Sequence, residues 1–334
     1  MLSRVAESIY WMARYVERAE NVARFIDVND NLTLGEGVNL GEQWAPLVYT
    51  TGDQELFKEL YGEPTRDSVL RFLAFDPRNP NSILSCVAAA RENARSVRES
   101  ITAPMWEHVN KFHLMVKSAL QNHRFASEPN QFCDMVKHAS HSLVGTTYTT
   151  MSHGEAWHFA RVGRLLERAD KTSRIVDVQY YHLLPDVKHV GSALDVVRWS
   201  ALLQSASALT MYRRVHGRIT PEKVADFLLL DRYFPRAMRF CLMRVQSSIS
   251  EITGSRPGTF SCRSEQFAGR LRGEMDYTAV DDIVRQGMHE YIDQFQRHLN
   301  EIGDALHKDF FTLDTDADTS PQTLSQRQSQ HLLP

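Results

Sequence analysis

The 334-residue sequence has little of several features that mark common protein classes. Its 4 cysteines are far apart and form no Cys-x-x-Cys pair, so neither a disulfide framework nor a zinc ribbon is indicated. Only 16 glycines and 12 prolines interrupt the chain, which permits long helices. The phosphate-loop, dinucleotide-binding and nucleophile-elbow motifs are missing, which excludes sites built on those motifs.

Long apolar runs are missing as well. No stretch approaches the roughly 18 uninterrupted apolar residues of a membrane span, and charged residues interrupt the N-terminal segment where a signal peptide is apolar. These features predict a cytoplasmic protein without a membrane association. His138 and His141 have no Asp or Glu at metal-ligand spacing, so we expect no metal site, and no motif points to a cofactor.

Lysine is scarce among the cations, since the chain has 30 arginines and 8 lysines. The planar guanidinium suits carboxylates, phosphates and buried ion pairs better than the hydrated lysine ammonium. The bias predicts ion-pair networks between helices or an anion site. The net charge of −3 argues against general attraction to nucleic acid.

The most informative feature that is present is an internal repeat. Residues 3–28 and 153–178 match at an offset of 150, and residues 44–86 match 199–241 at an offset of 155. A repeat on this scale predicts one helical bundle of two tandem repeats, about 1–150 and about 151–312, that share one core. The charged positions retained in both copies are Arg14, Glu17, Arg18, Arg24 and Asp27 in the first and Arg164, Glu167, Arg168, Arg174 and Asp177 in the second.

The apolar periodicity predicts an all-α fold. Apolar residues at alternating steps of four and three form one seam along the first helix, and no convincing period-2 strand pattern occurs. Residues 313–334 lack aromatic residues and periodicity, which predicts a disordered tail. We expect long helices near 3–30, 80–101, 103–125, 129–151, 155–183, 191–216, 233–252 and 277–311, and shorter ones near 42–60, 66–75 and 221–230. Loops are expected at 34–43, 127–130, 183–192 and 251–260.

The retained charges admit two interpretations. An exposed i to i+4 ion pair contributes only about 0.2–0.5 kcal/mol, which is too little to explain why both copies keep the same residue types. The charged residues therefore form either a fully paired network buried between helices or a functional surface or cleft.

A second charged cluster occurs in the first half alone. Arg91, Arg95 and Arg98 stand at i, i+4 and i+7, so a helix through 101 would place three guanidiniums on one stripe, with Glu92 and Asn93 beside it. We name Arg91, Arg95 and Arg98 the arginine stripe. It predicts either an anion site or pairing with acidic neighbours.

These motifs together resemble the bacterial alpha-E family, a domain of unknown function. The resemblance spans about residues 1–312 and implies an all-helical fold. Where the family pattern has Arg-Asp before Glu155, this chain has His153 and Gly154. The positions that the resemblance implies for substrate or partner binding are Glu17, Arg18, Asn21, Arg24, Arg91, Glu92, Asn93, Arg95, Arg98, Glu155, Trp157, Glu167, Arg168 and Asp170.

The resemblance also implies partners. Alpha-E proteins are associated with circularly permuted ATP-grasp proteins, often with transglutaminase-like peptidases nearby, and with peptide modification through amide bonds. We therefore expect an accessory subunit of an ATP-grasp-type amide ligase that binds the ligase or its acidic peptide substrate.

Two other functions remain as alternatives. One is an enzyme that acts on an acyl or phosphoryl intermediate in a cleft lined by Glu17, Glu167, Arg91 and Arg95. The other is a nucleic-acid-binding helical protein that uses the arginines, which the interleaved acidic residues disfavour. Sequence alone assigns no catalytic residue.

Overall fold

The computed structural model describes residues 1–33, 44–121, 128–182, 193–256 and 258–312. These residues form helices and connecting turns, and no strand occurs among them. The prediction of an all-α fold is therefore confirmed. The loops predicted at 34–43 and 183–192 and the tail predicted at 313–334 lie outside the described residues.

The helices follow each other with short connections. Those of the first half are α1 (Ser3–Thr33), α2 (Ala45–Thr51), α3 (Gln54–Tyr61), α4 (Arg66–Ala74), α5 (Ile83–Ser96), α6 (Ala103–Gln121) and α7 (Pro129–Thr150). Those of the second half are α8 (Glu155–His182), α9 (Ala193–Ser205), α10 (Leu209–His216), α11 (Pro221–Leu230), α12 (Met238–Thr253), α13 (Arg263–Tyr277), α14 (Val280–Gln286) and α15 (Met288–Leu306). A π-helical turn, His307–Phe311, follows α15.

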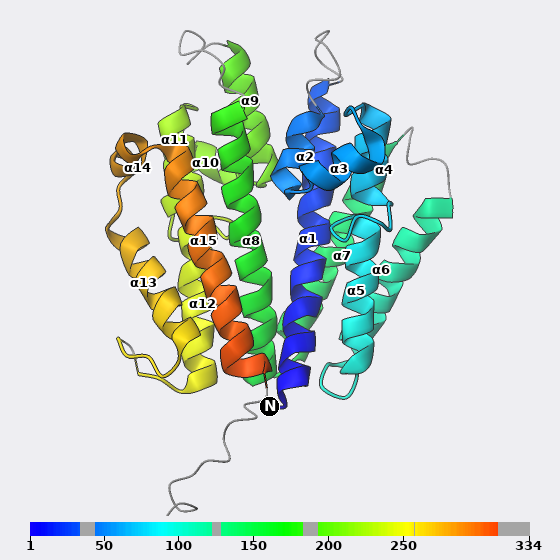
Figure 1. The fold of residues 1–334 in the computed structure, drawn as a ribbon, viewed down its shortest axis with the longest axis vertical. Helices are drawn as coiled ribbons and strands as arrows, with labels where there is room; N and C mark the ends of the chain where they lie inside the picture. The colour runs from blue at the N-terminus through cyan, green and yellow to red at the C-terminus, as the bar shows by residue number, and fades with distance from the viewer. Residues whose placement is uncertain (34–43, 122–127, 183–192, 257, 313–334) are drawn as a thin grey trace, which may run out of the picture.

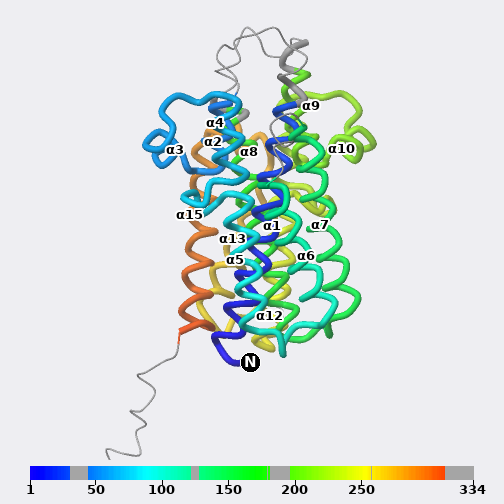
Figure 2. Tube along the Cα trace, turned by 90° about the vertical axis from the view of Figure 1, so that its right-hand side faces the viewer, coloured from blue at the N-terminus to red at the C-terminus, as the bar shows by residue number. Residues whose placement is uncertain are grey.

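Helices α1 and α8 run side by side through the middle of the bundle (Figure 1). Helices α5, α6 and α7 lie on one side of this pair, and α12, α13 and α15 lie on the other. The short helices α2–α4 and α9–α11 gather at the end away from the N-terminus, as Figure 2 also shows. One continuous cluster of buried apolar side chains includes residues of both halves.

The central helices approach closely where α8 carries a glycine, and both helices have buried alanines. Ala6, Ala19 and Ala23 are buried on α1, and Ala169 is buried on α8. At Gly163 a Cβ atom would lie 2.3 Å from the carbonyl oxygen of Tyr10, so only glycine allows this separation of the two backbones. The face of α1 toward α8 carries Tyr10, Arg14, Glu17 and Arg18, whereas Met12 and Val16 of the seam lie on the side of α7.

Positions matched by the repeat have matching local structure. Thr65 and Thr220 both cap a helix by accepting a hydrogen bond from the backbone three residues on. The thiols of Cys86 and Cys241 lie 3.7 and 3.5 Å from the carbonyl oxygens of Pro80 and Pro235. These likenesses agree with the predicted repeats, whose division near residue 150 stays a prediction.

Several predicted helix limits are wrong. Helix α13 was not predicted, and its two glycines, Gly269 and Gly273, weaken the helical pattern there. The helix predicted over 191–216 is broken at Ser207, which has a φ of 51°. The helix predicted over 277–311 is broken at Gly287, where φ is 106°. The helix predicted over 80–101 is α5, which ends at Ser96.

The shared core leads to a prediction about fragments. A chain of residues 1–150 would expose the face of α1 that packs on α8 and leave apolar surface without a partner. We expect this fragment to be unfolded or to aggregate when it is expressed alone. Thermal unfolding followed by circular dichroism checks this, and a monomeric fragment with a cooperative transition would contradict a shared core.

Candidate functional site

Two Glu-Arg pairs face each other where α1 crosses α8. Arg168 donates to both oxygens of Glu17 at 2.8 Å, from Nε and from Nη2. In the reverse direction Arg18 donates from Nε and Nη2 to the two oxygens of Glu167, at 2.7 and 3.0 Å. Each Glu-Arg dipeptide thus binds the other through two bidentate ion pairs, an arrangement we call the Glu-Arg clamp.

Further donors differ between the two halves of the clamp. Arg14 donates to Glu167 at 2.9 Å. The additional donor to Glu17 is Arg236, at 3.2 Å. In the repeat, Arg236 corresponds to Asn81, whose side-chain oxygen accepts from Arg18 at 2.8 Å. The second half therefore places an additional cation where the first half has an amide.

The clamp continues into a hydrogen-bond network on α1. Glu20 accepts from Nη2 of Arg24 at 2.7 Å and from the hydroxyl of Ser140 on α7 at 2.6 Å. The Nε2 atom of His141 lies 3.1 Å from Glu20, and Arg236 also donates to this carboxylate. The predicted site residues Glu17, Arg18, Asn21, Arg24, Glu167 and Arg168 all belong to this network.

The carboxylates of the network are buried and stay ionised. Glu17 is 1% exposed, and Glu167 is fully buried. Burial alone raises the pKa of a carboxyl group, but Arg168 beside Glu17 and Arg18 beside Glu167 outweigh that effect and lower both pKa values. A carboxylate held ionised in this way is a poor general base near neutral pH, because it does not take up a proton there.

Asp170, another predicted site residue, lies next to the clamp on α8. It accepts from Nε of Arg174 at 3.0 Å, and the ammonium of Lys171 lies 3.2 Å away. Burial acts to raise the pKa of Asp170, but Lys171 and Arg174 lower it below its ordinary value. Glu167, Arg168, Asp170 and Arg174 of α8 thus have partners within the bundle.

The arginine stripe has a different geometry from the predicted one. Arg91 and Arg98 contact the indole ring of Trp106, with Cζ atoms 5.6 and 4.7 Å from its centroid. Arg95 pairs with Glu92 at 2.7 Å and points into solvent, 65% exposed. Since α5 ends before Arg98, the prediction of three guanidiniums on one helical stripe is wrong for this residue.

The remaining predicted positions are dispersed. Asn93 donates to the backbone of Ala89. Glu155 accepts from the amino group of Met1 at 2.7 Å. Trp157 stacks on His153 with ring centroids 4.2 Å apart. In the described chain no hydrogen bond or ion pair joins Arg91 or Arg95 to the clamp, and neither residue lines the two cavities beside the central helices.

Two cavities flank the central helices, one on each side. A cavity of about 270 Å³ lies between α1, α8 and α15 and contains Arg14, whose guanidinium is bound to Glu167. A cavity of about 310 Å³ lies between α1, α7 and α8 and contains Arg164. The sequence comparison matched Arg14 with Arg164 but did not single out either residue as a site.

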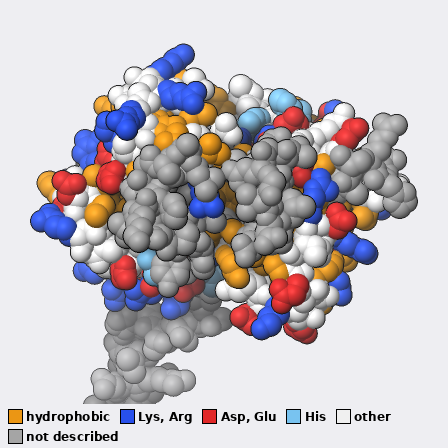
Figure 3. Space-filling model, turned by 90° about the horizontal axis from the view of Figure 1, so that it is seen from above, with side chains coloured by type: hydrophobic (Ala, Val, Ile, Leu, Met, Phe, Trp, Pro, Cys, Tyr) orange, Lys and Arg blue, Asp and Glu red, His pale blue; other side chains and the backbone are white. Residues whose placement is uncertain are grey.

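Other kinds of site find no support in the described residues. No three His, Cys, Asp or Glu side chains in that part of the chain are grouped as metal ligands are. None of the described helices has the length and apolar character to cross a membrane. Figure 3 shows cationic and acidic side chains interspersed on the described surface of one end of the bundle, where a nucleic acid would need a continuous basic surface.

A family model described as an alpha-helical domain with a conserved ER motif, Alpha-E, matches residues 1–311. The chain belongs to the Alpha-E family. Its sequence holds two Glu-Arg dipeptides, at 17–18 and 167–168, and both form the clamp. In this Alpha-E chain the motif named in the family description is therefore an ion-pair junction between the two central helices.

Similar curated proteins are mycobacterial. Uncharacterized protein Mb2597 of Mycobacterium bovis and uncharacterized protein MT2643 of Mycobacterium tuberculosis are each 22% identical over 329 residues. The match covers 91% of this chain but 36% of each relative, so the chain spans about a third of their length. No solved structure matches the chain.

Proposed function

We propose that this Alpha-E chain is the helical accessory partner of an ATP-grasp-type amide ligase and that it binds the ligase or its acidic peptide substrate. The observation that carries this proposal is the closed Glu-Arg clamp. Its carboxylates are buried, ionised and fully paired, so the charged motif holds the bundle together and leaves bond-forming chemistry to another protein.

The length of the relatives supports the same proposal. In the mycobacterial proteins the region similar to this chain is part of a much longer chain. An accessory module that works beside catalytic domains would be arranged in this way, either joined to them or as a separate chain. A circularly permuted ATP-grasp protein is the first partner that we propose, and a transglutaminase-like peptidase is the second.

The exposed part of α5 is the surface that we assign to acidic groups of the partner or peptide. Arg95 reaches solvent, and among the residues that the structure describes its one ion-pair partner is Glu92, itself 53% exposed. Arg91 is less available to a partner, because it also donates a hydrogen bond to Asn110 at 2.8 Å and contacts the ring of Trp106. An exposed ion pair of this kind is weak, so Arg95 can leave Glu92 and pair with an acidic group of the partner.

Arg95→Ala should weaken binding of the ATP-grasp protein or of an acidic peptide by about tenfold, since a charge-assisted contact is lost. Isothermal titration of the purified chain with each partner, at two salt concentrations, measures this. Arg285→Ala is the matched control, because Arg285 is 75% exposed and pairs with Asp282 at the same i, i+3 spacing.

Equal affinities of the two variants would remove α5 from the interface. Failure of the ATP-grasp protein and of acidic peptides to bind wild type would overturn the partnership. If the chain alone converted an acyl or phosphoryl intermediate of the ligase, it would be an enzyme and the proposal of an accessory role would be wrong.

A further inference from the structure

The cavity between α1, α7 and α8 has mostly apolar walls and one exceptional polar group. Met12 and Val16 of α1, Leu143 and Val144 of α7 and Ala160 of α8 line it. Its volume of about 310 Å³ corresponds to on the order of ten water molecules, enough for a small organic ligand. We name this space the α7 cavity.

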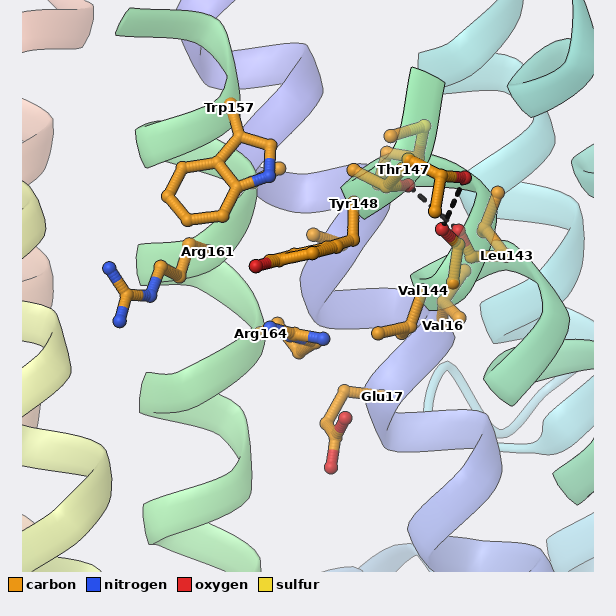
Figure 4. A pocket seen from close by; sticks show the side chains of 14 residues that line it. Val16, Glu17, Leu143, Val144, Thr147, Tyr148, Trp157, Arg161 and Arg164 are labelled. Atoms are coloured by element: carbon orange, nitrogen blue, oxygen red, sulfur yellow. Dashed lines mark hydrogen bonds between the residues drawn. The ribbon is translucent and has the colours of Figure 1, made fainter. Parts of the chain in front are cut away.

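The exceptional group is the guanidinium of Arg164. Figure 4 shows its side chain extending from α8 across the cavity, while that of Arg161 points away. Arg164 is partly buried, and it has no hydrogen bond or ion pair with any residue that the structure describes. A guanidinium that faces a mostly apolar cavity without a hydrogen-bonded anion is available to bind an external one.

The repeat explains why Arg164 is unpaired. Its counterpart Arg14 donates to Glu167 at 2.9 Å and to the hydroxyl of Tyr10 at 3.0 Å. At the position of Tyr10 the second half has Ala160, which removes an acceptor and opens the cavity.

The carboxylate that corresponds to Glu167 is also occupied. Glu17 is bound by Arg168 on both oxygens and by Arg236, and the residue that corresponds to Arg236 in the first half is the neutral Asn81. Arg236 thus takes the place at Glu17 that would complete the pairing of Arg164. Two substitutions between the halves, Tyr10 against Ala160 and Asn81 against Arg236, leave one guanidinium free inside an apolar cavity.

The surroundings of Arg164 select the charge of the ligand. Burial, followed by the neighbouring Arg168, lowers the pKa of Arg164 to about 10, so it remains a cation at neutral pH. Glu17 also lines the cavity and would repel a second negative charge. A guanidinium binds a carboxylate through two parallel hydrogen bonds, so a monoanionic carboxylate fits better than dianionic phosphate.

The rim of the cavity is aromatic. In Figure 4 the hydroxyl of Tyr148 points from α7 toward α8, on the side of Arg164, and Trp157 lies beyond it. Tyr148 is 64% exposed and can donate a hydrogen bond to the same carboxylate. Aromatic rings at the entrance favour a ligand with an apolar or aromatic body.

We propose that the α7 cavity binds a monocarboxylate with an apolar or aromatic body, through ion pairing with Arg164 and a hydrogen bond from Tyr148. Two sources share this chemistry, a free carboxylic acid and the C-terminal carboxylate of a peptide that ends in a large apolar residue. This site is separate from the α5 surface and does not depend on a ligase partner.

The test is isothermal titration of the purified full chain with defined probes. These are 3-phenylpropionate and octanoate as free acids, Gly-Gly-Phe as a peptide, its C-terminal amide, and inorganic phosphate. We expect the better of the two sources to bind with a Kd between about 10 µM and 1 mM, as suits about ten non-hydrogen atoms held within the cavity. Tighter binding of Gly-Gly-Phe would identify a peptide C-terminus as the ligand, and tighter binding of the free acids would identify a free carboxylic acid.

Variants decide whether Arg164 carries the binding. Arg164→Met should weaken binding about ten- to a hundredfold, and Arg164→Lys should restore part of it. Ala160→Tyr should abolish binding, because it fills the cavity and returns the acceptor that Arg14 has. The matched control is Arg14→Met, which should leave the affinity unchanged.

Thermal melting separates a binding role from a structural one. Arg164→Met should keep or raise the Tm, since it removes an unpaired charge from a mostly apolar cavity, whereas Arg14→Met should lower the Tm by several degrees. The proposal is overturned if neither free acid nor tripeptide binds, if the tripeptide amide binds as well as the best carboxylate, if phosphate binds best, or if Arg164→Met does not change the affinity.

Discussion

Glu167→Gln should lower the free energy of unfolding by about 3–5 kcal/mol, because it removes one partner from a buried ion pair. The substitution keeps the shape of the side chain but takes the charge away from Arg18 and Arg14, which both donate to it. Lys171 also lies 3.7 Å from this carboxylate. Urea unfolding at neutral pH, followed by circular dichroism, measures the change.

The matched control is Glu92→Gln on α5. Glu92 also pairs with two arginines, Arg91 and Arg95, but it is 53% exposed. The same substitution should cost far less there, since exposed pairs contribute little. If Glu167→Gln unfolded at the wild-type urea concentration while binding of a partner was lost, the clamp would be a site and not a scaffold.

Much of the architecture could be read from the sequence. The four-and-three spacing on α1 and α8 predicts their apolar seams, and the offset of 150 residues predicts that the two helices occupy matching places. The apolar spacing and the repeat do not predict how the two helices cross or which side chains meet there. Only this crossing shows that Glu17 binds Arg168, not the arginine next to it, and that Glu167 binds Arg18.

The missed elements have local physical reasons. Helix α13 carries two glycines and a weak apolar pattern, and it is stabilised by packing on α12 and α15. Tertiary contacts of this kind override propensity and leave no sequence signal. The break at Ser207 is similar, because this residue has a positive φ without being glycine, and Arg24 donates to its hydroxyl.

The α7 cavity was missed for another reason. In sequence Arg14 and Arg164 are equivalent, and their different states follow from positions that are distant in the chain. Ala160 lies one turn before Arg164, but Arg236 lies 72 positions after it and reaches the site through the fold. The comparison of the repeats does show two differences, Tyr10 against Ala160 and Asn81 against Arg236. Only the structure shows that both positions lie beside the same arginine pair.

The stability of the protein should fall steeply in acid, by about 3–4 kcal/mol between pH 6 and pH 3 from Glu20 and Glu167 alone. Burial acts to raise the pKa of both groups, but hydrogen bonding to His141 and the charge of Arg236 for Glu20, and the charges of Arg18 and Arg14 for Glu167, lower it far more. A depressed folded-state pKa contributes stability above the unfolded value of about 4.3 and loses it as the pH falls. Glu17 adds to the loss in the same direction.

Urea midpoints measured from pH 7 to pH 3 test this expectation. Between pH 4 and pH 3 the unfolded chain binds about two more protons than the folded chain at Glu20 and Glu167, so the free energy should fall by about 2–3 kcal/mol per pH unit. Glu167→Gln removes one of these groups and should make the dependence shallower by about one proton. Because the variant starts from a lower stability, the slope and not the midpoint is the quantity to compare. A wild-type stability that stays flat down to pH 3, or a variant with an unchanged slope, would show that the clamp carboxylates are not held ionised by their arginines.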